Sequence, residues 1–295
     1  MKKSENMEEY FAEQAKGEFQ KEIDDILKTI KCQMDLELKM FPKIDLKWDD
    51  LKNDMNASAK KIADDEYRIT INVYTPWYLK KVLLWDKLNT EFVNVKKGCL
   101  VHSFISHILS FIMWHEYYHI AFGHCTIPQY QGEFNERISE DQGSFERQQF
   151  ETMCDMAAAR KFAADIFIIY QEKRCKEVFE WLLAILYIYF HQCERNQKDK
   201  ISVNDIINEH RTHPFPTIRF DYILDVLKCE MERIGLSYEE RMCIDEGAIE
   251  KLKSIDCYEG FEIDLSSEQI KNYKRRLMEI DLKKLLKHAK KIYIK

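Results

Sequence analysis

The sequence predicts an α+β protein that is predominantly helical and contains one small sheet. Only 8 glycines and 5 prolines occur in 295 residues, too few for a turn-rich all-β chain. Apolar residues recur at helical spacing along most of the chain, whereas the alternation typical of strands is confined to residues 41–75. Apolar residues make up 45% of the sequence, enough for a substantial core. We therefore expect one folded domain with a mixed or antiparallel sheet.

Charge and cysteine content narrow the possible classes of partner and compartment. Lys and Arg number 45 against 51 Asp and Glu, and the net charge of -6 argues against nucleic acid as a partner. The 9 cysteines are scattered and form no CxxC pair, which favours a reducing cytosol. The N-terminus becomes acidic where a signal peptide would be apolar. We expect a soluble, cytoplasmic protein.

Three segments follow one another along the chain. Residues 1–40 form a helical lead, residues 41–235 the core, and residues 236–295 a helical C-terminal segment that is basic at its end. Within the core, Ile44, Leu46 and Trp48 alternate with polar residues, as do the apolar residues of YRITINVYT at 67–75. We expect two or three strands here. The second stretch is expected at a sheet edge, where an extended peptide could pair with it.

The remaining core is predicted to be helical. The first of its long helices is apolar nearly all round and carries several histidines, so we expect it inside the core. A polar segment at 129–144 follows it and is a candidate lid. Ser202 and Asp205 have the spacing of a capping box for a later helix. The predicted helices span residues 100–125, 145–172, 175–193 and 218–234.

The C-terminal stretch at 269–295 differs from the rest in charge. It holds ten Lys or Arg against two acidic residues, and Ile270, Tyr273 and Leu277 begin an apolar stripe along it. Such a helix could contact a membrane surface or a partner protein. A helix packed on the domain with a solvated basic face is the preferred interpretation.

The strongest functional signal is the HExxH motif formed by residues 115–119, inside the apolar helix. Residues four apart point to the same side of a helix, so His115 and His119 can bind one metal ion. Neutral imidazole is a good zinc ligand. Glu116, next to the first ligand, can take a proton from a metal-bound water. The alternative is that both histidines are satisfied within a core helix.

A second signal lies in the next helix, at ETMCD. Catalytic zinc needs three protein ligands and one open position, and Glu151 is a candidate for the third ligand. Asp155 lies on the same helical face and could accept the free N–H of a ligating histidine, which would fix its tautomer. The alternative for the pair alone is a helix surface with exposed acids.

A third signal is His213-Pro214, followed by Arg219 in a loop that leads into a helix. A histidine there could donate a hydrogen bond to an oxyanion, and the arginine could hold a carboxylate or a peptide backbone. His124 misses the position that a metzincin's third histidine ligand would need. We expect it at the C-terminal end of the helix, where the helix dipole favours a histidine.

Together the three signals resemble the gluzincin metallopeptidases, most closely the family of HtpX, Oma and the type 1 CAAX prenyl proteases. That family shows HExxHxxxGH, ExxxD and HP followed by Arg; here the motifs are HEYYHIAFGH at 115–124, ETMCD at 151–155 and HPFPTIR at 213–219. The resemblance covers residues 100–219. Many family members have spanning helices, and this chain resembles a soluble form. More loosely, it is similar to ImmA/IrrE-like proteases and to Lit-like phage-exclusion peptidases.

The resemblance implies a zincin-like metallopeptidase fold with one Zn²⁺ per chain. The implied roles are zinc ligands for His115, His119 and Glu151, general base for Glu116, orientation of a histidine for Asp155, and a place near the transition state for His213 and Arg219. We expect a zinc metallopeptidase, an endopeptidase by preference, that hydrolyses an intracellular protein or peptide. The alternative is a catalytically silent binding protein on the same scaffold that recognises its partner through the basic C-terminal helix.

Overall fold

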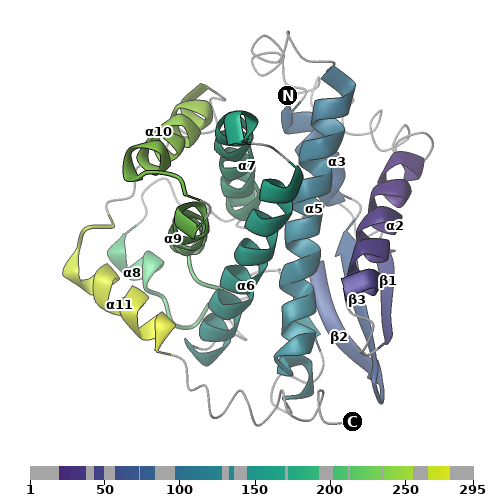
Figure 1. Cartoon of the computed structure of the whole chain (residues 1–295). Helices are drawn as coiled ribbons and strands as arrows, with labels where there is room; N and C mark the ends of the chain where they lie inside the picture. The colour runs from purple at the N-terminus through teal and green to yellow at the C-terminus, as the bar shows by residue number, and fades with distance from the viewer. Residues whose placement is uncertain are drawn as a thin grey trace, which may run out of the picture.

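The computed structural model describes residues 20–37, 43–49, 57–72, 74–83, 97–127, 133–135, 145–169, 172–192, 202–211, 213–233, 235–254 and 265–279. These residues form an α+β fold that is mostly helical and has one small mixed sheet, which confirms the predicted class. The long helix α5 (Lys97–Ala121) lies between the sheet and the other helices of the core (Figure 1). The residues of the HExxH motif therefore lie where the two halves of the fold meet.

Within the described residues the sheet has four strands in the order β1-β3-β2-β4. Strand β1 pairs with β3 in parallel, and β2 is antiparallel to both β3 and β4. The first three come from the region where strands were expected, whereas β4 comes from the polar segment predicted as a lid. Three residues of that segment thus belong to the sheet, and the rest of 129–144 lies outside the described residues. The strands are β1 (Lys43–Asp49), β2 (Ala57–Ala63), β3 (Glu66–Asn72) and β4 (Glu133–Asn135).

The prediction that YRITINVYT forms a sheet edge is wrong. Ile69 of β3 pairs with Leu46 of β1 on one side and with Ala59 of β2 on the other, so β3 is an inner strand. Alternation of apolar and polar residues reports that one face of a strand is buried. It carries no information on whether one or two strands lie beside it.

The buried face of the sheet contacts α5. Tyr67, Ile69 and Ile71 of β3 are buried, and Ala57 and Ala59 of β2 lie opposite the two isoleucines. Alanine leaves room for a helix to approach the strand closely, and α5 contacts β2. The sheet thus covers one side of α5.

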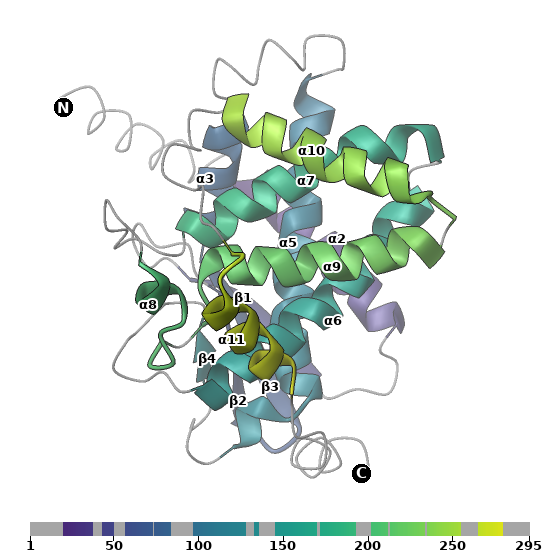
Figure 2. The same cartoon turned by 90° about the vertical axis from the view of Figure 1, so that its left-hand side faces the viewer.

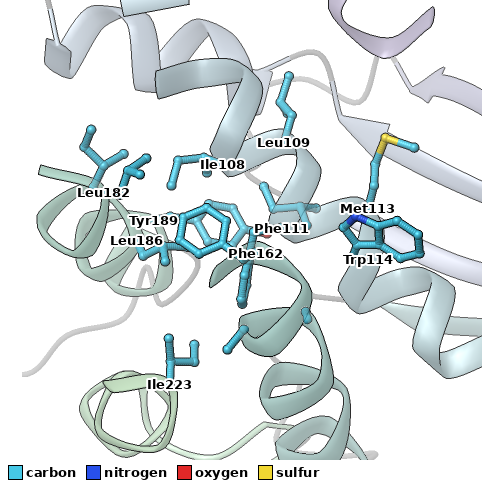
Figure 3. Close-up of a cluster of buried hydrophobic side chains, with 14 of the residues drawn as sticks. Ile108, Leu109, Phe111, Met113, Trp114, Phe162, Leu182, Leu186, Tyr189 and Ile223 are labelled. Carbon is cyan, nitrogen blue, oxygen red and sulfur yellow. The ribbon is translucent and has the colours of Figure 1, made fainter. Parts of the chain in front are cut away.

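Helices α6 (Phe145–Ile169) and α7 (Glu172–Gln192) cover the other side of α5, and all three confirm predicted helices to within a few residues at most ends. The rings of Phe111 and Phe162 are in edge-to-face contact at 5.8 Å between centroids. In Figure 3, Phe111 and Ile108 point from α5 toward Phe162 and Tyr189. Burial on both sides explains why the α5 sequence is apolar nearly all round.

The other helices extend the helical half of the molecule. Figure 2 shows α9 and α10 on the face turned away from the sheet, with α11 beside them. The predicted capping box at Ser202 and Asp205 is present at α8. Helix α11 buries Ile270, Tyr273 and Leu277, whereas residues 280–295 lie outside the described residues. These helices are α2 (Gln20–Glu37), α3 (Tyr74–Leu83), α8 (Val203–Ile206), α9 (Pro216–Arg233), α10 (Tyr238–Ser254) and α11 (Glu268–Met278).

Among the helices that the structure describes, none is both long enough and apolar enough to cross a membrane. The run Trp181–Phe190 in α7 is buried along its whole length within the fold. It packs as an interior helix, as its sequence predicts.

Candidate metal centre

His115 and His119 lie one turn apart on α5, and their side chains converge. Their Nε2 atoms are 3.1 Å apart, and each residue is only 1% exposed. The helix holds both rings on the side that faces α6. This is the arrangement that the HExxH spacing predicts.

Glu151 of α6 completes a group of three. Its Oε2 lies 3.1 Å from Nε2 of His115 and 3.2 Å from Nε2 of His119. The buried small residues Ala158 and Ala159 lie further along α6, which packs directly against α5. The three ligand atoms form a buried group that could hold a metal ion.

The spacing of the three atoms fits a tetrahedral ion. Zinc binds nitrogen and carboxylate oxygen at ~2.0–2.2 Å, which places the ligand atoms of a tetrahedron about 3.3–3.6 Å apart. The separations of 3.1 and 3.2 Å lie just below this range. The other carboxylate oxygen of Glu151, Oε1, is buried and has no hydrogen-bond donor among the described residues. A cation between the three atoms would compensate this buried charge.

Asp155 decides which nitrogen of His115 can serve as a ligand. Its Oδ1 lies 2.9 Å from Nδ1 of His115, while Arg219 donates to both of its oxygens at 2.8 and 2.9 Å. Burial raises the pKa of Asp155, but Arg219 and His115 together bring it below its usual value. An ionised carboxylate only accepts hydrogen bonds, so Nδ1 of His115 carries the proton. The lone pair of Nε2 then points toward Glu151.

The charge of Glu151 leads to the same conclusion. Burial raises the pKa of this carboxyl group, yet the neighbouring His213 and His119 bring it well below its usual value. An ionised Glu151 and the lone pair of His115 are both acceptors, and they lie 3.1 Å apart. Two acceptors at this distance are stable only with a proton or another cation between them. The donor set therefore fits a metal ion.

His213 reaches this group from the loop before α9. Its Nε2 is 3.2 Å from Oε2 of Glu151, and the residue is 1% exposed. Gln148 of α6 fixes the start of this loop by donating to the backbone oxygens of Asn208 and Arg211 at 2.8 and 2.9 Å. Gln148 lies one turn before Glu151, so one helix positions both the third ligand and the loop that carries His213.

Arg219 was predicted to hold a carboxylate or a peptide backbone, and the carboxylate that it binds is that of Asp155. Its guanidinium also lies over the ring of Phe190 at 4.3 Å, and the residue is 2% exposed. A carboxylate that is fully buried requires a charged partner, and Arg219 provides it. Its place is behind His115, on the side away from Glu151.

His124 was expected to end the helix, and this prediction is wrong. Helix α5 ends at Ala121, and Gly123 adopts a left-handed conformation with φ 78°, which turns the chain back. His124 is consequently 0% exposed, with its Nδ1 3.0 Å from Nδ1 of His119. A glycine directly before a histidine was the available signal in the sequence, because only a turn there brings His124 under the helix.

Cys154 is a further residue that the sequence analysis missed. Its Sγ lies 3.7 Å from Nδ1 of His124, and it shares a helical face with Glu151. Burial, followed by the charges of Glu151 and Asp155, raises the pKa of the Cys154 thiol well above its usual value. His119, His124 and Cys154 form a second buried group of potential ligand atoms, which shares His119 with the first.

Every side chain at the centre of this site is buried. The predicted base Glu116 is 1% exposed, as are His115, His119, Glu151 and His213. A substrate can reach these atoms only if covering segments move. Comparison with protein-family models, with curated proteins and with solved structures found no match for this chain. The gluzincin resemblance therefore stays a prediction that depends on the three motifs.

Proposed function

We propose that this chain is a zinc-dependent metallopeptidase with a zincin-like fold. One observation carries the proposal: two histidine nitrogens and one carboxylate oxygen converge within 3.1–3.2 Å, with a glutamate next to the first ligand in the sequence. Three protein ligands leave a fourth position for water or substrate, which is the composition of catalytic rather than structural zinc sites. Two histidines and one glutamate are a known ligand set of catalytic zinc.

The chain's own residues divide the work. His115, His119 and Glu151 hold the ion, and Asp155 keeps the proton of His115 on Nδ1, away from the ligand nitrogen. Zinc in such a site supplies a Lewis acid and a water whose pKa falls to about 7. Glu116 would take a proton from the attacking water as the water oxygen bonds to the scissile carbonyl carbon, and would deliver it to the amine nitrogen as the C–N bond breaks, so that Glu116 ends unprotonated.

His213 and Arg219 have different parts in this scheme. His213 is 3.2 Å from a ligand atom, which favours a role as hydrogen-bond donor to the oxyanion that develops on the scissile carbonyl. Arg219 acts through Asp155 and is a positioning residue, since its guanidinium is engaged by the carboxylate. The substrate is a protein or peptide that gains access when the buried site opens.

The test compares wild type with Glu116→Gln in cells, by labelling the new protein N-termini that each produces. Glutamine keeps the shape of the side chain but cannot take the proton, so the variant should retain zinc and produce none of the wild-type cleavages. Zinc content of both proteins is measured in parallel. Cleavage by Glu116→Gln at the wild-type rate would show that Glu116 is not the base. Identical N-termini in cells with wild type, with the variant and with neither would contradict peptidase activity.

A second candidate function is a binding protein that keeps the metal centre without hydrolysis. The observation that favours it is the burial of all five central side chains, each 1% exposed. In that case the ion stabilises the fold, and the partner surface lies elsewhere on the chain. Partner binding that survives in Glu116→Gln, with no cleavage by wild type, would favour this candidate.

A further inference from the structure

The second zinc ligand, His119, has a partner behind it, the histidine that ends the HEYYHIAFGH stretch. We propose that His124 is a positioning residue that accepts the Nδ1 proton of His119 and so directs the Nε2 lone pair of His119 to the metal. The proposal deepens the function proposed above and depends on its metal centre. It assigns to His124, for the second ligand, the task that Asp155 has for the first.

The proton count of an imidazole leads to this assignment. A neutral histidine carries one ring proton, and a ligand nitrogen must be free of it. Nε2 of His119 lies 3.1 Å from Nε2 of His115 and 3.2 Å from Glu151, so it is the ligand nitrogen. The proton therefore belongs on Nδ1, which lies 3.0 Å from Nδ1 of His124. This is an ordinary N–H···N distance, so His124 accepts at Nδ1 and carries its own proton on Nε2.

The ring of His124 is held in place for this task. It stacks on Phe150 of α6, with ring centroids 4.3 Å apart and an interplanar angle of 22°. The left-handed Gly123 directs the chain into this position, and His124 is 0% exposed. Because the turn at Gly123 and the stacking on Phe150 both hold the ring, its Nδ1 lone pair points in one direction. This is the arrangement expected of a residue that orients a metal ligand.

In the alternative arrangement, Cys154 and His124 are ligands of a second metal ion, which shares His119 with the first. One argument from proton count opposes it. A second ion there would require His119 to lose its remaining ring proton and to bridge two cations as an imidazolate. Sγ of Cys154 lies 3.7 Å from Nδ1 of His124, a longer hydrogen-bond contact than the 3.0 Å from Nδ1 of His119, so the closer partner of this nitrogen is His119.

The experiment replaces His124 by phenylalanine or by asparagine. Phenylalanine keeps an aromatic ring against Phe150 but offers no acceptor, whereas the Oδ1 of asparagine can stand in for Nδ1. Zinc affinity is measured by competition with a chromophoric chelator. His124→Phe should bind zinc about 10–100-fold more weakly, as expected for the loss of such a partner, and His124→Asn should recover most of this loss.

Proton NMR of the zinc-loaded proteins supplies a signature that a purely structural role would not change. Among the protected imidazole N–H resonances of wild type, one should come from His115 on Asp155 and one from His119 on His124. His124→Phe should lose the second and keep the first, and His124→Asn should keep both. Circular dichroism checks that each variant is folded. If His124→Phe is unfolded, His124→Leu gives the same comparison.

Three results would overturn the assignment, each in a distinct way. Wild-type zinc affinity and both resonances in His124→Phe would show that His119 needs no acceptor there. Two ions per wild-type chain, with a thiolate-to-cobalt charge-transfer band that Cys154→Ala removes, would show a second metal site instead. Absence of zinc from wild type would overturn the metal centre itself, and the positioning role with it.

Discussion

The two histidines of the HExxH motif lie one turn apart on the same helix, yet their surroundings differ in charge. His115 is backed by Asp155, whose carboxylate is held by Arg219 in a fully buried ion pair. His119 is backed by the imidazole of His124, with the thiol of Cys154 beyond it. Asp155 and Arg219 come from α6 and α9, whereas His124 lies only five residues after His119 in the sequence. On the proposals above, an ion pair behind one histidine and an imidazole behind the other would orient the two ligands in the same way.

The free energy of unfolding should depend more on the ion pair behind His115 than on the groups behind His119. In Arg219→Met the carboxylate of Asp155 stays buried without its guanidinium, and we expect the free energy of unfolding to fall by about 3–5 kcal/mol. Urea denaturation of the metal-free protein measures this. Arg233→Met is the control, because Arg233 pairs with Glu230 at 68% exposure and should change stability by about 0.5 kcal/mol or less. Equal losses in the two variants would contradict the account of the buried pair.

Bound zinc should stabilise the protein only through its three ligands, His115, His119 and Glu151. Zinc at 100 times its dissociation constant should raise the free energy of unfolding of wild type by about 2.7 kcal/mol. Glu151→Ala should show no zinc-dependent change, because it lacks one ligand. Thermal unfolding with zinc and with a chelator measures the difference. A shift in Glu151→Ala as large as in wild type would place the bound ion elsewhere.

Two substitutions of Asp155 separate the effect of its negative charge from the effect of its hydrogen-bond acceptor. Asp155→Asn keeps an acceptor oxygen that can face His115, whereas Asp155→Ala removes it. We expect Asp155→Ala to weaken zinc binding by about 10–100-fold and Asp155→Asn to weaken it less. Chelator competition gives both values. Equal losses would mean that the negative charge, rather than the accepted hydrogen bond, supports the ligand.

Cys154, which lies beyond His124 as seen from His119, should contribute least to stability and to zinc affinity. Cys154→Ala removes a small buried side chain 3.7 Å from His124, and we expect stability to fall by about 1 kcal/mol. Zinc affinity should stay within about threefold of wild type. A loss as large as that of Asp155→Ala would give Cys154 a direct part in the metal centre.

Much of the helical half of the fold can be predicted from the sequence, because burial leaves a periodic pattern. The apolar character of α5 predicts a helix covered on two sides, and the sheet and α6 cover it. Likewise, the i, i+4 spacing of His115 and His119, and of Glu151 and Asp155, puts each pair on one helical face. Local geometry fixes these relations, so a single sequence is sufficient to find them.

The relations that the sequence does not reveal depend on contacts between segments. Alternation in β3 could not show that strands lie on both sides of it, and three residues gave no sign of β4. The partner of Arg219 depends on how α9 packs on α6, and His124 reaches His119 only through the turn at Gly123. For Arg219 and His124, the residue type indicated the chemistry, but tertiary structure determined the partner.

Metal content of the purified protein, with Glu151→Ala beside it, tests the central claim most directly. Elemental mass spectrometry should find about one zinc per wild-type chain after excess metal is removed, and close to none in Glu151→Ala. The result follows if the three converging atoms hold the ion. Absence of metal from wild type after zinc is supplied, or one zinc in both proteins, would contradict the metal centre and the peptidase proposed from it.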